Sequence, residues 1–421
     1  MATAAPVSPS RQRVLDTLAH RTPDRIPIDF GSSTVCGIHT LAIAELRDYY
    51  GLEKRPVKIF EPFQMLGLID DDLKRAMGID VEGVYRRKTM FGFANDRWKE
   101  WRFHGRDVLV SEDFVTSTDA NGDLLIHPEG DRNAPPSGRM PQGFYFFDAI
   151  IRQNHFDEEN LNPEDNMEEF KVLSDADLAG IVEDVRAANE TGRAVVANLG
   201  GMGYGDIALV PAPFLKDPRG IRDITEWYVS LRARKEYVHK IFERQTEVAL
   251  QNLERGFGAL GNSFDALFVC GTDFGTQTSS FCSVATFREL WLPYYKTVCD
   301  WVHKNTTWKC FKHSCGSVER FYDSFIEAGF DIVKPGAVFG GGDGAGSAEG
   351  ALWEPAGVLG RGRGYAAGAA VWDAGRGAKA GAGALRDIRA GWWLRVQHDP
   401  QHPGPNTGCQ HRGDVGCAEG I

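Results

Sequence analysis

Residues 194–335 alternate apolar segments of strand length with helical patterns, and this alternation limits the possible folds more than any other feature. In chain order the segments are a strand at 194–200, a helix at 235–256, a strand at 266–275, a helix at 283–305, a strand at 308–316, a helix at 317–329 and a strand at 330–335. Apolar strands joined by helices are typical of a parallel sheet covered by helices. We therefore expect an α/β fold with its chemistry at the carboxyl ends of the strands.

Local signals indicate where several elements begin, bend or end. Pro293 predicts a kink within the helix at 283–305, because proline lacks the backbone donor that a helix interior needs. Ser317 is expected to cap the next helix and Gly329 to end it. In the first 100 residues we expect a helix over 10–20 capped by Ser10, a strand over 25–31, and a helix that ends near Gly78 and is followed by another strand. Further along, we expect an antiparallel β segment over about 98–150 and an acidic helical stretch over 162–190.

The composition of the chain indicates which binding partners and which cellular compartment to expect. The formal net charge of −11 argues against nucleic acid and against an anionic membrane. No apolar run approaches the roughly 20 residues that cross a bilayer, and the N-terminal residues lack the pattern of a secretory signal. The eight cysteines are too sparse for a disulfide scaffold, so we expect reduced thiols in a cytoplasmic protein.

The sharpest chemical signal is a histidine and a cysteine two positions apart at the end of a predicted strand. Side chains of His313 and Cys315 point the same way on a strand, so imidazole and thiolate can converge on one ion. Zinc accepts both ligand types. A buried cysteine beside a hydrogen-bonded histidine is the alternative interpretation. The junction with a following helix favours the thiolate, and hence the zinc site.

Three further polar residues follow neighbouring predicted strands. Asp273 and Gln277 lie in GTDFGTQT, and Asn198 lies in the glycine-rich NLGGMGYGD. We expect these side chains to orient a substrate at the carboxyl edge of the sheet. For Asp273 the alternative is a cap of the following turn. The run Asp70–Asp72 is interpreted as the start of a helix rather than as a metal site.

Longer motifs occur together over residues 10–335. They are TPDRIPIDFGS, IHPEGDRNAPPSGRMPQGFYFFDAI, PFLKDPRGIR, GTDFGTQT, LWLPYYK and FKHSCGSVERF. Together they resemble the uroporphyrinogen decarboxylase superfamily, nearest the branch of corrinoid-dependent methyltransferases. The resemblance implies a (β/α)8 barrel of the TIM type over residues 1–335, with the antiparallel β segment as an insertion and the site at the carboxyl ends of the strands.

The methyltransferase branch also implies a function. Its H-x-C pair, matched by His313 and Cys315, holds zinc, and a corrinoid on a partner protein carries the methyl group. A zinc-bound thiol is deprotonated and is therefore a nucleophile at neutral pH. We expect zinc-assisted methyl transfer to or from a small molecule, with Asp273, Asn198 and Gln277 around the substrate.

Decarboxylation of uroporphyrinogen is the alternative activity within the same superfamily. There Asp273 would steady the protonated pyrrole intermediate. The decarboxylases resemble one another in an N-terminal arginine-rich segment, whereas this chain has no arginine between Arg25 and Arg47. A polycarboxylate substrate needs several cations, so the sequence favours methyl transfer.

Residues 336–421 differ from the rest of the chain. They hold 22 of the 48 glycines and contain none of the family motifs. Such abundance of glycine, alanine and arginine is typical of a GC-rich gene read out of frame. When codons for the last residues are chosen freely and read one base later, the resulting peptide resembles the C-terminal end of the family. We therefore hypothesise a frameshift near Pro335, with a natural glycine-rich disordered tail as the alternative.

Either origin of this tail leaves the predicted barrel incomplete at its C-terminus. The third zinc ligand of the methyltransferases, a cysteine from a downstream strand, then has no counterpart. Cys409 and Cys417 are not replacements, because restoring the frame would erase both. An inactive frameshifted product is therefore a third alternative.

Overall fold

The computed structural model describes residues 7–276 and 278–335, together with the backbone of a two-residue strand at 394–395. Gln277 lies outside the described residues. So do residues 336–393 and 396–421, which the frameshift hypothesis concerns.

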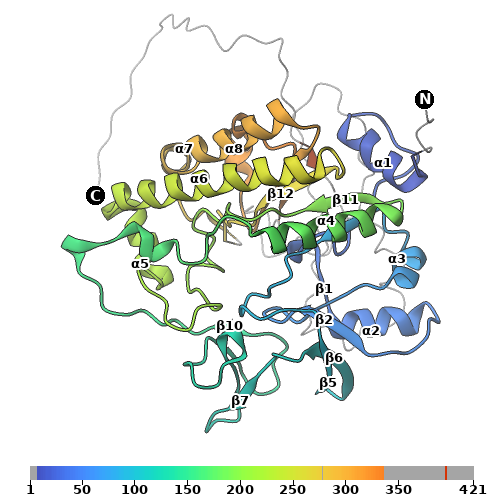
Figure 1. The fold of residues 1–421 in the computed structure, drawn as a ribbon, viewed down its shortest axis with the longest axis horizontal. Helices are drawn as coiled ribbons and strands as arrows, with labels where there is room; N and C mark the ends of the chain where they lie inside the picture. The colour runs from blue at the N-terminus through green and yellow to red at the C-terminus, as the bar shows by residue number, and fades with distance from the viewer. Residues whose placement is uncertain (1–6, 277, 336–393, 396–421) are drawn as a thin grey trace, which may run out of the picture.

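A parallel sheet forms the centre of the molecule (Figure 1). Its strands, in spatial order, are β4 (Val81–Val84), β11 (Ala194–Ala197), β12 (Ala266–Cys270), β13 (Lys309–Ser314) and β14 (Ile332–Pro335), and β15 (Leu394–Arg395) pairs antiparallel with β14. Each predicted strand between 194 and 335 is present, although the observed strands are shorter. Asn198 and Asp273, which the prediction placed at the ends of strands, lie in the loops after β11 and β12, whereas His313 lies within β13.

The described strands form an open sheet rather than a closed barrel. The α/β class with parallel strands is therefore observed. Closure into a (β/α)8 barrel stays a prediction, because it requires strands on both sides of those described here.

Helices cover this sheet and bury a continuous apolar core (Figure 1). The covering helices are α4 (Asp175–Glu190), α5 (Ile224–Ala233), α6 (Lys235–Leu260), α7 (Val284–Leu290), α8 (Leu292–Asn305) and α9 (Tyr322–Ala328). Ser174 and Asp177 form a capping box at the start of α4. The predicted break at Pro293 is confirmed, since α7 ends at Leu290 and Pro293 lies in the first turn of α8.

The end of α9 is confirmed and its predicted start is wrong. Gly329 follows the helix with φ +94°, a left-handed conformation that favours glycine. Ser317 does not occupy the cap position, because Phe321 directly precedes α9 and Val318 directly precedes the turn before it. A short 3-10 turn (Glu319–Phe321) precedes α9 instead.

Two predictions near the N-terminus need correction. The first helix, α1 (Pro9–Leu18), is capped by Ser8 rather than Ser10. The predicted strand over 25–31 is absent. Pro27 has no amide to donate, and the amide of Ile28 donates to the Asp80 carboxylate at 2.9 Å, which replaces a strand partner.

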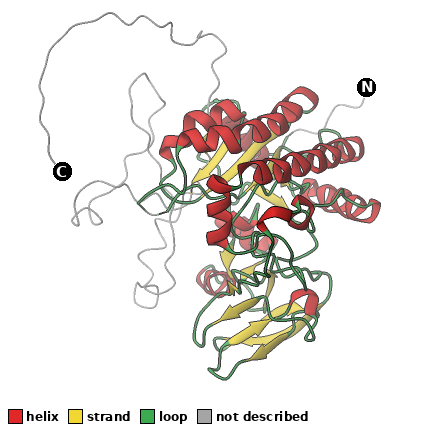
Figure 2. Cartoon of the chain, turned by 90° about the vertical axis from the view of Figure 1, so that its left-hand side faces the viewer, coloured by secondary structure: helices red, strands yellow, loops and turns green. Residues whose placement is uncertain are grey.

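A second region, rich in antiparallel strands, lies below the parallel sheet (Figure 2). One sheet contains β1 (Ile38–His39), β2 (Val57–Glu61), β3 (Leu66–Gly67), β5 (Trp98–Phe103) and β6 (Arg106–Ser111), and another contains β7 (Thr116–Thr118), β8 (Leu124–Ile126), β9 (Gly138–Met140) and β10 (Asp148–Ala149). The antiparallel pairing expected after Trp98 is thus observed from β5 to β10. This region has a separate apolar core.

Helices α2 (Thr40–Tyr49) and α3 (Asp71–Met77) complete the N-terminal half. The start of α3 confirms the interpretation of the acidic run, because Asp71 and Asp72 occupy its first turn and Asp72 pairs with Arg47 at 2.9 Å. Gly78 ends this helix as predicted. In the stretch 162–190 only a 3-10 turn (Pro163–Asn166) and α4 are helical. No described helix is both long enough and apolar enough to span a membrane.

Candidate metal centre

The predicted histidine and cysteine lie side by side at the carboxyl end of β13. Nε2 of His313 is 3.1 Å from Sγ of Cys315. Nδ1 of the same ring lies 2.9 Å from the Lys334 carbonyl oxygen on β14. A carbonyl only accepts, so Nδ1 carries the hydrogen and the Nε2 lone pair faces the sulfur.

Asp273, in the loop after β12, joins this pair. Its Oδ1 accepts a hydrogen bond from the Cys315 amide at 2.5 Å and lies 3.7 Å from Nε2 of His313. One ligand atom from each of the three side chains lies within 4.8 Å of the other two. The sequence assigned Asp273 to the substrate, whereas this geometry also makes it a potential third ligand.

Two glycines permit the close approach of the loops after β12 and β13. Gly316 has φ +82°, and a Cβ atom there would lie 2.3 Å from the carbonyl carbon of Gly275. Backbone therefore packs directly on backbone at this point. This contact explains why Asp273 reaches the H-x-C pair, since any side chain at Gly316 would push the loops apart.

Burial sets the protonation of these ligands. It raises the pKa of the Asp273 carboxyl, and together with Asp273 it raises the pKa of Cys315 to about 12. Burial and the nearby Lys334 lower the pKa of His313 to about 3. At neutral pH the imidazole is therefore uncharged, as a metal ligand must be, and Cys315 stays a thiol unless a cation draws its proton away.

Lys312 lies beneath the three candidate ligands, and the sequence did not indicate a role for it. It is fully buried, and its Nζ donates to the carbonyls of Thr272 and His313, both at 3.1 Å. The ammonium also lies over the rings of Phe274 and Tyr295, at 4.9 and 5.0 Å. It thereby joins the two loops that carry the ligands. A lysine inside an apolar strand was the signal that could have revealed it.

Two more polar side chains near the centre were also missed. Burial and the neighbouring Asp273 raise the pKa of the Asp206 carboxyl to about 6. The buried hydroxyl of Tyr228 has no hydrogen-bond partner among the described residues, and Asp273 and Asp206 act on it electrostatically. Asp206 closes the glycine-rich NLGGMGYGD, the motif in which the sequence pointed to Asn198.

Asn198, the residue chosen in that motif, is not brought into contact with the three ligands among the described interactions. Its Oδ1 accepts from the Gly200 amide at 2.8 Å, which shapes the turn after β11. Thr276 likewise closes a turn, through its bonds to Ser279. Gln277 lies outside the described residues.

A second His-Cys-Asp cluster lies where β13 and β14 begin. Nε2 of His303 is 2.6 Å from Oδ2 of Asp331, and the same oxygen accepts from the Cys310 amide at 2.9 Å. Lys309 bonds the other carboxylate oxygen at 3.3 Å. Since Asp331 is already satisfied by these donors, we interpret the cluster as a charged clamp between α8 and the sheet.

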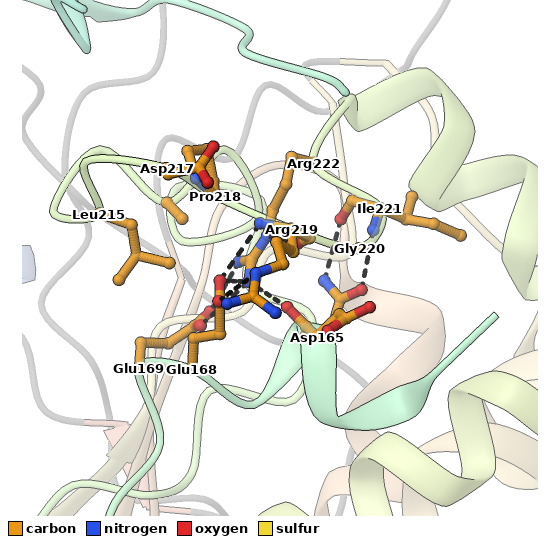
Figure 3. Close-up of polar contacts among 12 residues, drawn as sticks. Asp165, Glu168, Glu169, Leu215, Asp217, Pro218, Arg219, Gly220, Ile221 and Arg222 are labelled. Atoms are coloured by element: carbon orange, nitrogen blue, oxygen red, sulfur yellow. Dashed lines mark hydrogen bonds and ion pairs between the residues drawn. The ribbon is translucent and has the colours of Figure 1, made fainter. Parts of the chain in front are cut away.

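The motif PFLKDPRGIR forms a structural clamp around Arg222 (Figure 3). Arg222 is fully buried, bonds Glu169 through two nitrogens at 3.0 and 3.3 Å, and donates to the carbonyls of Asp165 and Arg219. A pocket of about 20 Å³, room for one water molecule, separates this pair from Asp206. Because its donors are used, Arg222 holds the loop rather than a ligand.

Comparisons with known proteins complete the description. No protein-family model matches the chain, and no curated protein matches it either. Among solved structures, the chain is similar to a methyltransferase from Methanosarcina mazei at 12% sequence identity and a TM-score of 0.38, over 76% of this chain and 74% of that chain. These values describe a distant structural relation. The superfamily to which the sequence motifs point therefore stays an expectation.

Proposed function

We propose that the chain is a zinc-dependent methyltransferase in which Asp273, His313 and Cys315 hold the metal and a corrinoid on a separate protein carries the methyl group. The observation that supports this proposal is the convergence of carboxylate, imidazole and thiol from two adjacent strand ends. The corrinoid partner rests on the sequence resemblance alone.

The three side chains fit zinc in both number and kind. Catalytic zinc sites use three protein ligands of nitrogen, sulfur or oxygen and keep a fourth position open. The Lys334 carbonyl fixes the tautomer of His313, as outer-shell partners of zinc-bound histidines do. Besides burial, the charge of Asp273 raises the pKa values of Asp206 and Cys315, and a cation bound among these groups would offset that repulsion.

When bound, zinc would lower the pKa of an acceptor thiol and hold it as a thiolate. The protein's own groups then have distinct tasks. Asp206, with a pKa near 6, is the base that accepts the proton released by the thiol. Tyr228 presents its free hydroxyl beside the same carboxylates and would orient the bound molecule. The deeper Lys312 keeps the two ligand loops in register.

Metal content of the full chain tests the proposal first. We expect about one zinc per chain, lost in His313→Ala, Cys315→Ala and Asp273→Ala. Cobalt in the same site should give a thiolate absorption band that disappears in Cys315→Ala. Matched controls are His155→Ala, an exposed histidine, and Cys282→Ser, a half-buried cysteine in the loop before α7. Zinc retained in all three ligand variants contradicts the metal centre.

Activity is tested separately with methylcobalamin as donor and a panel of small thiols as acceptors. We expect release of the demethylated corrinoid with the zinc-loaded chain and at least about a hundredfold less with Asp206→Asn, because that variant removes a general base. If the zinc-loaded chain transfers no methyl group to any thiol, the metal site stands and the proposed reaction is contradicted.

A further inference from the structure

Two consecutive arginines after β4 have opposite surroundings. Arg87 pairs with Glu183 and Asp184, both at 3.0 Å, and bonds the Gly180 carbonyl. Arg86 makes no ion pair or hydrogen bond within residues 7–276 and 278–335. The fork of five donors that arginine offers is therefore unused at one of the two positions.

The Arg86 guanidinium lies against the glycine turn that follows β11. A Cβ atom at Gly200 would be 3.5 Å from Cζ and 3.6 and 3.7 Å from the two terminal nitrogens. Gly200 itself has φ +71°. Strands β4 and β11 are parallel neighbours, with Val84 opposite Ala197, so Arg86 stands at the carboxyl edge of the sheet. The missing side chain at Gly200 leaves space beside the charge.

Asn198 borders the same turn. Its Oδ1 is engaged by the Gly200 amide, which leaves the two hydrogens of the Nδ2 amide as donors. The side chain is half-buried. A cationic fork and a neutral amide donor thus both border the turn at Gly200.

The Arg86 side chain is exposed to solvent, and desolvation by its surroundings lowers the pKa of the guanidinium. Asp177 is the one carboxylate that acts on it appreciably, and that group is engaged in the capping box of α4, where it bonds Ser174. Because the Arg86 guanidinium makes no ion pair or hydrogen bond with the described residues, its donors are available to an anion.

We propose that Arg86, Gly200 and Asn198 form a subsite for a carboxylate of the substrate. A planar carboxylate matches the guanidinium fork through two parallel hydrogen bonds. One cation balances one negative charge, so a monoanionic carboxylate fits better than a phosphate dianion. The subsite shares the carboxyl edge of the sheet with Asp273 and His313, so the anion would anchor the molecule that exchanges the methyl group. In that role the inference rests on the proposed function.

Arginine-selective labelling tests the subsite without any activity assay. Phenylglyoxal is added to the full chain, and the modification rates of Arg86 and Arg87 are compared by peptide mass spectrometry. We expect Arg86 to react several-fold faster, because Arg87 is held in ion pairs. Sodium acetate at constant ionic strength should slow the reaction of Arg86 severalfold and leave that of Arg87 unchanged. Inorganic phosphate in a parallel series should protect less.

Equal rates at the two arginines, or no protection by acetate, overturn the proposal, and stronger protection by phosphate overturns the choice of a carboxylate. Two variants sharpen the test. Asn198→Ala should weaken protection by acetate several-fold, whereas Arg87→Gln should leave it intact. Zinc content is measured on the same samples. A chain that lacks zinc and still shows acetate protection at Arg86 retains the subsite without the proposed function, so the two failures are distinguishable.

Discussion

At the scale of single residues, the chemistry of the candidate centre depends on which atoms are already engaged. The H-x-C spacing was enough to predict that His313 and Cys315 converge, because that geometry is local to one strand. The position of Asp273 depends on how the loops after β12 and β13 approach each other, which no spacing reveals. Asp206 was missed for the same reason, since its neighbours come from distant segments.

Gly316 is the residue whose replacement tests this approach most directly. Gly316→Ala places a Cβ against the Gly275 carbonyl and requires a positive φ. We expect a loss of about 2–5 kcal/mol in unfolding free energy, from left-handed strain and overpacking together. Gly51→Ala is the matched control, since Gly51 has φ +65° and open space around it and should cost only about 1 kcal/mol. Urea denaturation measures both, and equal losses would mean that the loops do not touch.

At the scale of elements, strands and helices with a regular apolar pattern were predictable. Segments whose conformation depends on hydrogen bonds to distant side chains were not. The strands from β11 to β14 follow from continuous apolar runs, and the α7–α8 break follows from Pro293. The segment 25–31 has the composition of a strand, yet the Asp80 carboxylate takes the place of a strand partner. A sequence pattern does not reveal that a side chain distant in the sequence replaces a strand partner.

The clamp between α8 and β14 makes a prediction about pH. The Asp331 carboxylate raises the pKa of His303 to about 10, from an ordinary value near 6.5. A raised pKa in the folded state stabilises the protein fully below the unfolded value, and the contribution is lost as pH rises from about 6.5 to 10. The gap in unfolding free energy between the unmodified chain and His303→Gln should therefore shrink over this range. His155→Gln, at an exposed histidine, should show no such trend. A gap that is constant from pH 6 to 10 contradicts the clamp.

At the scale of the whole molecule, the largest apolar core of the described residues is separate from the core of the antiparallel region. One lies between the parallel sheet and its helices, and the other lies within the antiparallel region. The sequence predicted both regions from a change of periodicity near Trp98. It also predicted a barrel incomplete at its C-terminus, and the described strands form an open sheet.

Separate cores predict separate local stabilities. Phe147 is 1% exposed within the antiparallel core, whereas its neighbour Phe146 is 46% exposed. Phe147→Ala should cost about 3–5 kcal/mol and increase amide hydrogen exchange in β5 to β10, while β12 and β13 stay protected. Phe146→Ala should leave exchange unchanged. Uniform loss of protection in Phe147→Ala would mean that the two regions unfold as one unit.

The hydrogen bond from the Cys315 amide to Asp273 has a consequence for how an ion would enter the centre. That bond and the contact between Gly275 and Gly316 join the two ligand-bearing loops through protein atoms alone. Small zinc domains gain their shape only on loading, so folding and metal affinity are coupled there. Here the cradle is preorganised. Loading and removal of the metal should therefore leave the far-ultraviolet circular dichroism unchanged, and the speed of exchange should follow access to the loops rather than refolding.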